Sequence, residues 1–375
     1  MLIEEVPEVD TLKDVAKIVK SLSDLGQPPS RYHGDLLAIE SAKIINYDVV
    51  KAISLHANPN LSWCSEANAQ IVSSIIQSNN LQSYLTQFLN QEFRSNLKKV
   101  EKQAKSGLGG RRSGLRPKLT FQDQTFDPVP LAQAWFLIEV TKNKDREVNM
   151  LILLLLIDDF YFDTWGKIET CKVLQKLKLD TLNSLVPQLR ESLSKCLLHI
   201  PPVTPEDESL SLLQVAYPSL YRVDDEFGTN LNYIETIATI MSSMSYAANF
   251  EKTMCFLLEQ LSICIKRIGV DVLISVSKIF YLLNQLITNI AMMERCKVIL
   301  AALRAQNEIL QLESPLLYSF IFDLVGAYAL LTKRVEKYKV ADIQEQISVN
   351  RGSLRQLAVS CGKLSEFDEL CTYIQ

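Results

Sequence analysis

The sequence predicts an all-α protein, an irregular α-solenoid of the HEAT or armadillo type with about 15 to 17 helices. Apolar residues recur at spacings of three and four along most of the 375 residues, which is the period of an amphipathic helix. Only 12 Gly and 13 Pro are present, and this composition favours helix over sheet. The helices follow one another at roughly 40 residues per pair, the spacing of stacked helical repeats. No repeat consensus accompanies that spacing, so the solenoid prediction depends on helix length and number.

Residues 1–105 are predicted to form an N-terminal helical region. Its first helix lies within 11–25 and ends at Gly26 and Pro28, because neither residue continues a helix well. A second helix is expected from about 34 to 56, ending at Asn58 and Pro59, and two more between 65 and about 105. Each carries one apolar stripe, which must pack on neighbouring helices.

A basic segment follows at residues 94–118, where nine basic residues accompany a single acid, Glu101. Four glycines interrupt it, so residues 106–127 are predicted to be a flexible linker. A solvated linker is the simpler interpretation, and a contact for an acidic partner surface or RNA is the alternative. No aromatic residue in the segment offers a base-stacking platform. The candidate contact residues are Arg111, Arg112, Arg116 and Lys118.

Helices resume at Pro128 and form a predicted helical-repeat region over residues 128–375. The pattern at 254–268 keeps the helical period for four turns, and Gly269 is placed to end that helix. Further helices are expected at 230–247, 271–284, 285–306 and 314–334. The apolar block 315–331 is interrupted by Asp323, and a membrane span needs about 20 apolar residues, so a buried helix is predicted. Without an N-terminal signal peptide, we expect a soluble protein of the cytoplasm and nucleus.

The central stretch 147–223 is predicted to form short helices joined by tight corners. An apolar run at 150–157 stops at Asp158 and Asp159, and an aromatic corner containing Trp165 follows. One of these aspartates is expected to cap the next helix near Thr164 or to bond to the backbone of the turn. The prolines at 201 and 202 then end a helix. A new helix is expected to begin after them, with Thr204 as its cap and Pro205 in its first turn. The acids of that turn, Glu206, Asp207 and Glu208, would meet the positive end of the helix dipole. The apolar face of this helix is expected to consist of Leu210, Leu213, Ala216 and Tyr217.

No catalytic, cofactor or metal site is predicted. No two of the three histidines lie at the sequence spacing of metal ligands. Asp158 and Asp159 are adjacent, so their side chains point in different directions and are poor partners for acid–base work. The eight cysteines form no Cys-x-x-Cys pair and are expected to be reduced thiols in apolar helix patterns. No kinase, Rossmann, P-loop or serine-hydrolase motif occurs.

The segment 193–220 resembles the signature segment of the family of the second Tel-Two-interacting protein, most sharply at 202–218. The resemblance implies a helical-repeat adaptor, the small subunit of the TTT co-chaperone complex, bound to larger helical-repeat subunits. It further implies that this complex assists the ninety-kilodalton heat-shock chaperone system in the maturation of phosphatidylinositol-kinase-related kinases. These kinases serve DNA-damage signalling. Fungal members also belong to a chromatin-linked assembly. The candidate motif residues are Asp158, Asp159, Trp165, Pro202, Thr204, Pro205, Glu206, Glu208, Leu210, Tyr217 and Pro218.

Two hypotheses from different classes follow. The first is the non-catalytic TTT adaptor, without cofactor or membrane. The second is a helical-repeat protein that associates with nucleic acid or chromatin through the basic loop 94–118. The formal net charge of −4 argues against a chain-wide nucleic-acid-binding surface, so nucleic acid is not expected as the main partner. Salt-sensitive binding that depends on Arg111, Arg112 and Arg116 would distinguish the second hypothesis.

Overall fold

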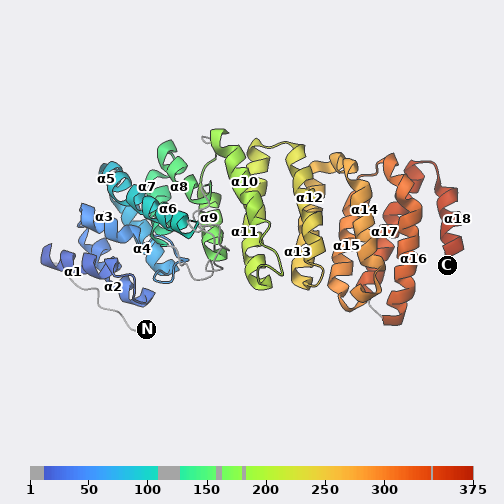
Figure 1. Cartoon of the computed structure of the whole chain (residues 1–375), viewed down its shortest axis with the longest axis horizontal. Helices are drawn as coiled ribbons and strands as arrows, with labels where there is room; N and C mark the ends of the chain where they lie inside the picture. The colour runs from blue at the N-terminus through green and yellow to red at the C-terminus, as the bar shows by residue number, and fades with distance from the viewer. Residues whose placement is uncertain (1–11, 109–126, 158–162, 180–182, 339–340, 375) are drawn as a thin grey trace. The chain divides into compact units, whose positions relative to one another are not determined.

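The computed structural model describes residues 12–108, 127–157, 163–179, 183–338 and 341–374 (Figure 1). These residues form the helices α1 to α18 with short 3-10 and π segments, and no strand occurs among them, which confirms the all-α prediction. The chain divides into two compact units. Unit 1 is residues 1–196 with 218–223, and unit 2 is residues 197–217 with 224–375. The predicted linker at 106–127 falls mostly on residues outside the described ranges and stays a prediction.

Unit 1 begins with short helices that pack around α7. Their bounds are α1 Leu12–Ser23, α2 Pro29–Ala42, α3 Tyr47–Ser54, α4 Glu66–Ser78, α5 Gln82–Phe88, α6 Arg94–Leu108, α7 Val129–Thr141, α8 Arg146–Ile157, α9 Thr164–Lys176 and α10 Val186–Cys196. The π segment Leu89–Phe93 joins α5 to α6. Phe136 of α7 is buried, and its ring centroid lies 5.3 Å from that of Phe88.

The single helix predicted at 34–56 is wrong, because the structure has two helices there. Lys43 ends α2 in the left-handed conformation with φ 50°, and its backbone N–H donates to the carbonyl of Ile39. Asn46 then begins α3 by accepting a hydrogen bond from the N–H of Val49 at 2.9 Å. Asn46 is a typical N-cap, so the sequence held a signal for this break.

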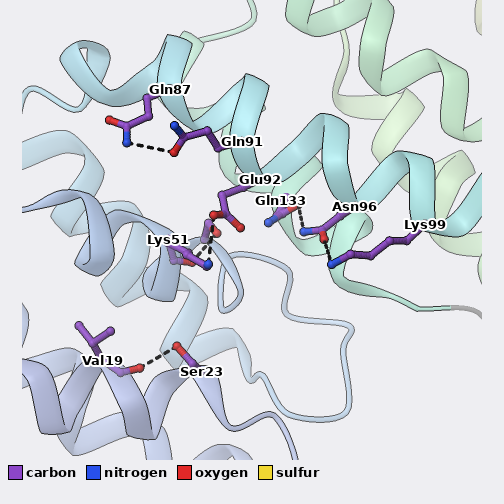
Figure 2. Close-up of polar contacts among 10 residues, drawn as sticks. Val19, Ser23, Lys51, Gln87, Gln91, Glu92, Asn96, Lys99 and Gln133 are labelled. Atoms are coloured by element: carbon purple, nitrogen blue, oxygen red, sulfur yellow. Dashed lines mark hydrogen bonds and ion pairs between the residues drawn. The ribbon is translucent and has the colours of Figure 1, made fainter.

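Polar contacts connect the elements of unit 1 (Figure 2). The Nζ atom of Lys51 in α3 lies 3.0 Å from Oε1 of Glu92 in the π segment. Asn96 of α6 is buried and donates to Gln133 of α7 at 3.1 Å. The ammonium of Lys99 donates to the amide oxygen of Asn96 at 2.9 Å. Part of the basic segment is therefore a helix that is anchored on α7.

Unit 2 consists of successive helices stacked in chain order (Figure 1). α13 packs on α15, and α15 on α17, while α14 packs on α16. Helix α11, Glu206–Phe227, contributes residues to both units. The other helices of unit 2 are α12 Asn230–Tyr246, α13 Glu251–Ile268, α14 Val276–Thr288, α15 Cys296–Leu310, α16 Ile321–Tyr338, α17 Ala341–Ser360 and α18 Leu364–Ile374. Gly269 ends α13 with φ 56°, as predicted. This unit carries two rows of helices, α12, α14 and α16 in one row and α13, α15 and α17 in the other.

The helix boundary predicted at 284 and 285 is wrong. α14 continues to Thr288, and the break lies at the 3-10 segment Ile290–Glu294. The side chain of Asn289 accepts from the N–H of Ala291 at 3.0 Å and starts that segment. Neither Gly nor Pro marks this break, and the apolar pattern runs through it with Met292 and Met293 buried. Periodicity alone therefore placed the boundary too early.

Hydrogen bonds in unit 2 recur at fixed sequence separations. Arg295 donates to the carbonyl of Ala248, 47 residues earlier, and Arg334 to that of Thr288, 46 residues earlier. Each arginine thereby satisfies a carbonyl at or just past the C-terminus of an earlier helix, α12 for Arg295 and α14 for Arg334. The separations match the length of one helix pair in HEAT and armadillo repeats, about 40 to 47 residues.

A buried polar ladder crosses the two rows at steps of 22 residues. Gln306 of α15 donates to Asn284 of α14 at 2.8 Å, and Tyr328 of α16 donates to Gln306 at 3.0 Å. Asn350 of α17 donates to the Tyr328 hydroxyl at 3.2 Å and to the carbonyl of Leu303 at 2.9 Å. Gln306, Tyr328 and Asn350 are fully buried. One polar side chain from each of four consecutive helices therefore fixes how the helices are aligned.

The stretch Pro315–Val335 is long and apolar enough to cross a membrane by length and composition, and 44% of its window is buried. In the described residues, the only other candidate for a membrane span is a pair of helical segments, Glu251–Ile274 and Val276–Thr288, which are bent by 117° relative to each other. Leu324, Val325 and Tyr328 of α16 are buried, and this helix packs on α14 and α17. One side of α16 is therefore core, as predicted for this block, whereas Phe322 and Leu330 on the rest of the helix are exposed, so the prediction of a buried helix is only partly correct.

Candidate protein-interaction surface

Several predicted site residues lie outside the described residues. These are Asp158, Asp159, Arg111, Arg112, Arg116 and Lys118. The helix after the aromatic corner, α9, is capped by Asp163, which accepts from the N–H of Gly166 at 2.9 Å, so neither Asp158 nor Asp159 caps it. The alternative, that one of them bonds to the backbone of the turn, lies outside the described residues. Trp165, the second residue of α9, is 41% exposed. Among the described residues, no group of three or more His, Cys, Asp or Glu could hold a metal ion.

The turn between α10 and α11 is closed by backbone and serine contacts. The N–H of Thr204 donates to the carbonyl of Ile200 at 3.2 Å. The Ser209 hydroxyl reaches back to the carbonyl of His199 at 2.7 Å. Pro205, rather than Thr204, is the N-cap residue of α11, so the predicted cap and the predicted place of Pro205 in the first turn are both wrong by one residue. Thr204 is buried in the turn, whereas Pro202 and Pro205 are exposed.

The acidic start of α11 has a role that its sequence position did not reveal. Glu206 accepts from the N–H and the hydroxyl of Thr253 at 3.0 and 3.3 Å. Thr253 is the third residue of α13, so Glu206 satisfies one of the free N–H groups at the start of that helix. Asp207 lies 3.1 Å from the ammonium of Lys252 in an exposed pair. The first turn of α11 is acidic, as predicted, and two of its acids contact α13.

The apolar side of α11 is core. Tyr217 is fully buried, and its ring meets that of Phe256 at a centroid distance of 5.8 Å in an edge-on arrangement. Leu210 is partly buried, while Glu208 and Pro218 are exposed. Of the nine candidate motif residues that the structure describes, Thr204, Glu206, Leu210 and Tyr217 pack or cap. The exposed ones, which a partner can reach, are Trp165, Pro202, Pro205, Glu208 and Pro218.

A larger exposed surface lies on the row α12, α14 and α16, which we name the apolar face. A groove of about 550 Å³ between α12 and α14 is lined by Met241, Lys278 and Tyr281 among others. A second groove of about 600 Å³ between α14 and α16 is lined by residues that include Tyr281 and Phe322. Tyr281 is 67% exposed and Phe322 is 63% exposed. Large apolar side chains exposed side by side are typical of interaction surfaces.

Charge is nearly absent from the apolar face. α12 contains one charged residue, Glu235, and α14 contains one, Lys278. In the first three turns of α16 only Asp323 is charged. The other row is different, because α13, α15 and α17 carry several exposed charges each, among them Lys252, Glu259, Lys266, Lys297, Arg304 and Arg355. The two rows of unit 2 thus present surfaces of different chemistry.

Sequence reasoning missed this face. Phe322 and Leu330 fall in the apolar block 315–331, which was predicted to be a buried helix, and Tyr281 occurs in the apolar pattern of α14 and was not singled out. Only the packing shows which side of α14 and α16 is covered. The shortage of charge in α12 and α14 was the one available signal, since exposed helix faces usually carry several charged residues.

Among protein-family models, that of the Tti2 family matches the chain over residues 49–294. The match spans more than half of the chain and includes the signature segment. The chain belongs to the Tti2 family. The resemblance predicted from the central segment is thereby confirmed, and Tti2 family membership supports a role in the TTT complex in general terms. Comparisons with curated proteins and with solved structures returned no match.

The Tti2 family match also covers part of the apolar face. It includes α12 and α14, whose residues line the first groove, and it ends before α16. The second groove is therefore formed by one helix inside the matched range and one beyond it.

Proposed function

We propose that this Tti2-family protein is a non-catalytic adaptor subunit of the TTT co-chaperone complex. In this role it binds a larger helical-repeat subunit and supports maturation of phosphatidylinositol-kinase-related kinases with the ninety-kilodalton heat-shock chaperone system, in cytoplasm and nucleus. The family match over residues 49–294 is the observation that carries the proposal.

The internal contacts of unit 2 support an irregular HEAT- or armadillo-like stack as the scaffold. Its hydrogen bonds recur 22 residues apart between consecutive helices and 46 or 47 residues apart between consecutive pairs. In such stacks each pair contacts only its neighbours, and one side of the array stays available as an extended binding surface. The exposed apolar side chains of α14 and α16 agree with a protein partner.

An adaptor of this kind works by mass action. A partner that binds the folded state of a large subunit, and not its unfolded state, shifts that subunit toward the folded state. The stabilised assembly can then present kinase chains to the chaperone. This mechanism requires shape and apolar complementarity but no reacting group, and no described cluster of side chains is needed for chemistry.

No observation favours the nucleic-acid alternative. The described part of the basic segment is α6, and there Arg94 pairs with Glu147 and Lys99 donates to Asn96. Some of its positive charge is thus engaged within the chain. The remaining candidates, Arg111, Arg112, Arg116 and Lys118, lie outside the described residues, so that alternative is left as an outcome of the test.

The test is affinity purification of the tagged full chain from its own cells at moderate salt, with measured stoichiometry. Near one-to-one recovery of larger helical-repeat subunits, with the kinases in smaller amounts, is the expected result. Recovery of the chain alone would contradict the adaptor role. Recovery of nucleic acid that falls steeply as salt is raised would favour the basic segment instead.

A further inference from the structure

We propose that the apolar face of α12, α14 and α16 binds an amphipathic helix of the larger helical-repeat subunit, whose large apolar side chain enters the groove between α14 and α16. The inference rests on the proposed function and adds to it the face, the groove and the chemistry of the partner. Helix-in-groove binding of this kind uses an apolar stripe with anchors three and four residues apart.

The groove between α14 and α16 has the form of a receptor for a side chain. Phe280 of α14 and Phe320, the last residue of the 3-10 segment Pro315–Phe320, both line it and pack edge to face on each other, with ring centroids 5.3 Å apart. Gly326 and Ala327 line it on α16, and these residues are small. A Cβ atom placed on Gly326 would meet no atom within 4 Å, so the space above this glycine is open. A contacting aromatic pair beside open space is a suitable environment for an interface anchor.

The buried polar ladder fixes the position of one side chain that lines this groove. Asn284 lines the groove and accepts a hydrogen bond from Gln306, which Tyr328 and Asn350 connect to α16 and α17. A side chain fixed in this way loses little conformational freedom when a partner binds. The groove is therefore preorganised.

The charges on the face select among possible partners. Nucleic acids and anionic lipid surfaces are bound through clusters of Lys and Arg, and Lys278 is the single basic residue in α12 and α14 together. The face thus fits an apolar protein surface. Lys278 lines the groove between α12 and α14, and Asp323 lines the groove between α14 and α16, so the complementary partner carries an acidic group opposite Lys278 and a basic group opposite Asp323.

A second copy of this chain fits the apolar face less well than a different helical protein does. A two-fold pairing centred on α14 would lay α12 of one copy over α16 of the other. The two copies of Lys278, which lies on α14, would then approach each other near the axis, and both are cations. Like charges at an interface oppose association. This repulsion favours a different helical protein over self-association.

The test fills the groove without removing any native contact. Gly326→Trp places a large side chain in the open space, and Gly326→Ala adds one methyl group at the same position and serves as the matched control. Lys297→Glu with Arg304→Glu changes the exposed side of α15, in the opposite row, and controls for general surface effects. Each full-length variant is co-expressed with the larger helical-repeat subunit of the TTT complex, and the amount of that subunit recovered per mole of tagged chain is measured. Thermal unfolding of each variant shows that it is folded.

We expect Gly326→Trp to reduce recovery by about tenfold or more, the effect of losing one interface anchor. Gly326→Ala and the α15 double variant should recover as much as the wild type. Full recovery with folded Gly326→Trp would overturn the inference while leaving the proposed function intact. Absence of the larger subunit even with wild type would contradict the proposed function and, with it, the assigned partner. Light scattering that shows a wild-type dimer abolished by Gly326→Trp would assign the face to a second copy and also overturn the inference.

Discussion

Replacing Tyr328 by Phe removes the central hydroxyl of the buried ladder and leaves the ring in place. That hydroxyl donates to Oε1 of Gln306 at 3.0 Å and accepts from Nδ2 of Asn350 at 3.2 Å. Because the phenyl ring keeps its volume, no cavity forms. Asn350 retains its hydrogen bond to the carbonyl of Leu303, whereas Oε1 of Gln306 loses the bond to Tyr328 at a fully buried position. The variant therefore isolates the cost of one buried acceptor.

An acceptor left unsatisfied by loss of its partner costs about 1 to 3 kcal/mol of unfolding free energy. For a unit of about 150 to 250 residues, each kcal/mol lowers the melting temperature by about 2 to 4 °C. The expected decrease for Tyr328→Phe is therefore about 2 to 12 °C.

Thermal unfolding followed by circular dichroism measures this change directly. Tyr281→Phe is the matched control, because its hydroxyl lies on the exposed side of α14 and its loss should change the unfolding free energy by less than about 0.5 kcal/mol. Equal melting temperatures for Tyr328→Phe and wild type would refute the claim that the ladder stabilises the stack. A double-mutant cycle with Asn350→Ala should show a coupling of about 0.5 kcal/mol or more, since the two side chains share a hydrogen bond.

Three further variants test separate features. Gly269→Ala should lower the unfolding free energy by about 1 to 2 kcal/mol in urea titrations, because φ 56° is unfavourable for any residue with a Cβ atom, and no loss would contradict that interpretation. Glu206→Ala should cost about 0.5 to 2 kcal/mol by removing the acceptor at the start of α13, whereas exposed Glu208→Ala should be neutral; equal effects would argue against a capping role. Burial lowers the pKa of His56, whose Nε2 donates to the carbonyl of Leu22 and whose Nδ1 is buried without a hydrogen-bond partner. The unfolded chain then binds a proton that the folded chain does not. The unfolding free energy should therefore be highest above the ordinary histidine pKa of about 6.5. Below that pH it should fall by up to about 1.4 kcal/mol per pH unit until the pKa of the folded state is reached. The same pH dependence in His56→Phe would show that His56 is not the cause.

The sequence by itself determined the class of the fold and several helix ends. An apolar period of three and four residues specifies a helix wherever it persists, because only one side of the helix can be buried. Gly269 marked the end of α13, and the acids from Glu206 to Glu208 marked the start of α11, since both are local properties of backbone and dipole. The central segment also pointed to the family, through residues of which some pack or cap and others are exposed.

Only the tertiary structure decided which side of each helix is covered. Tyr281 and Tyr328 both occur in apolar helical patterns, yet one is 67% exposed and the other is fully buried, because α15 and α17 cover one side of the α14 and α16 row. The contact between Glu206 and Thr253, and the ladder from Asn284 to Asn350, join residues far apart in the chain. Periodicity shows that a helix has an apolar side but contains no information about what packs against it. The polar partners and the apolar face therefore became visible only once the helices were stacked.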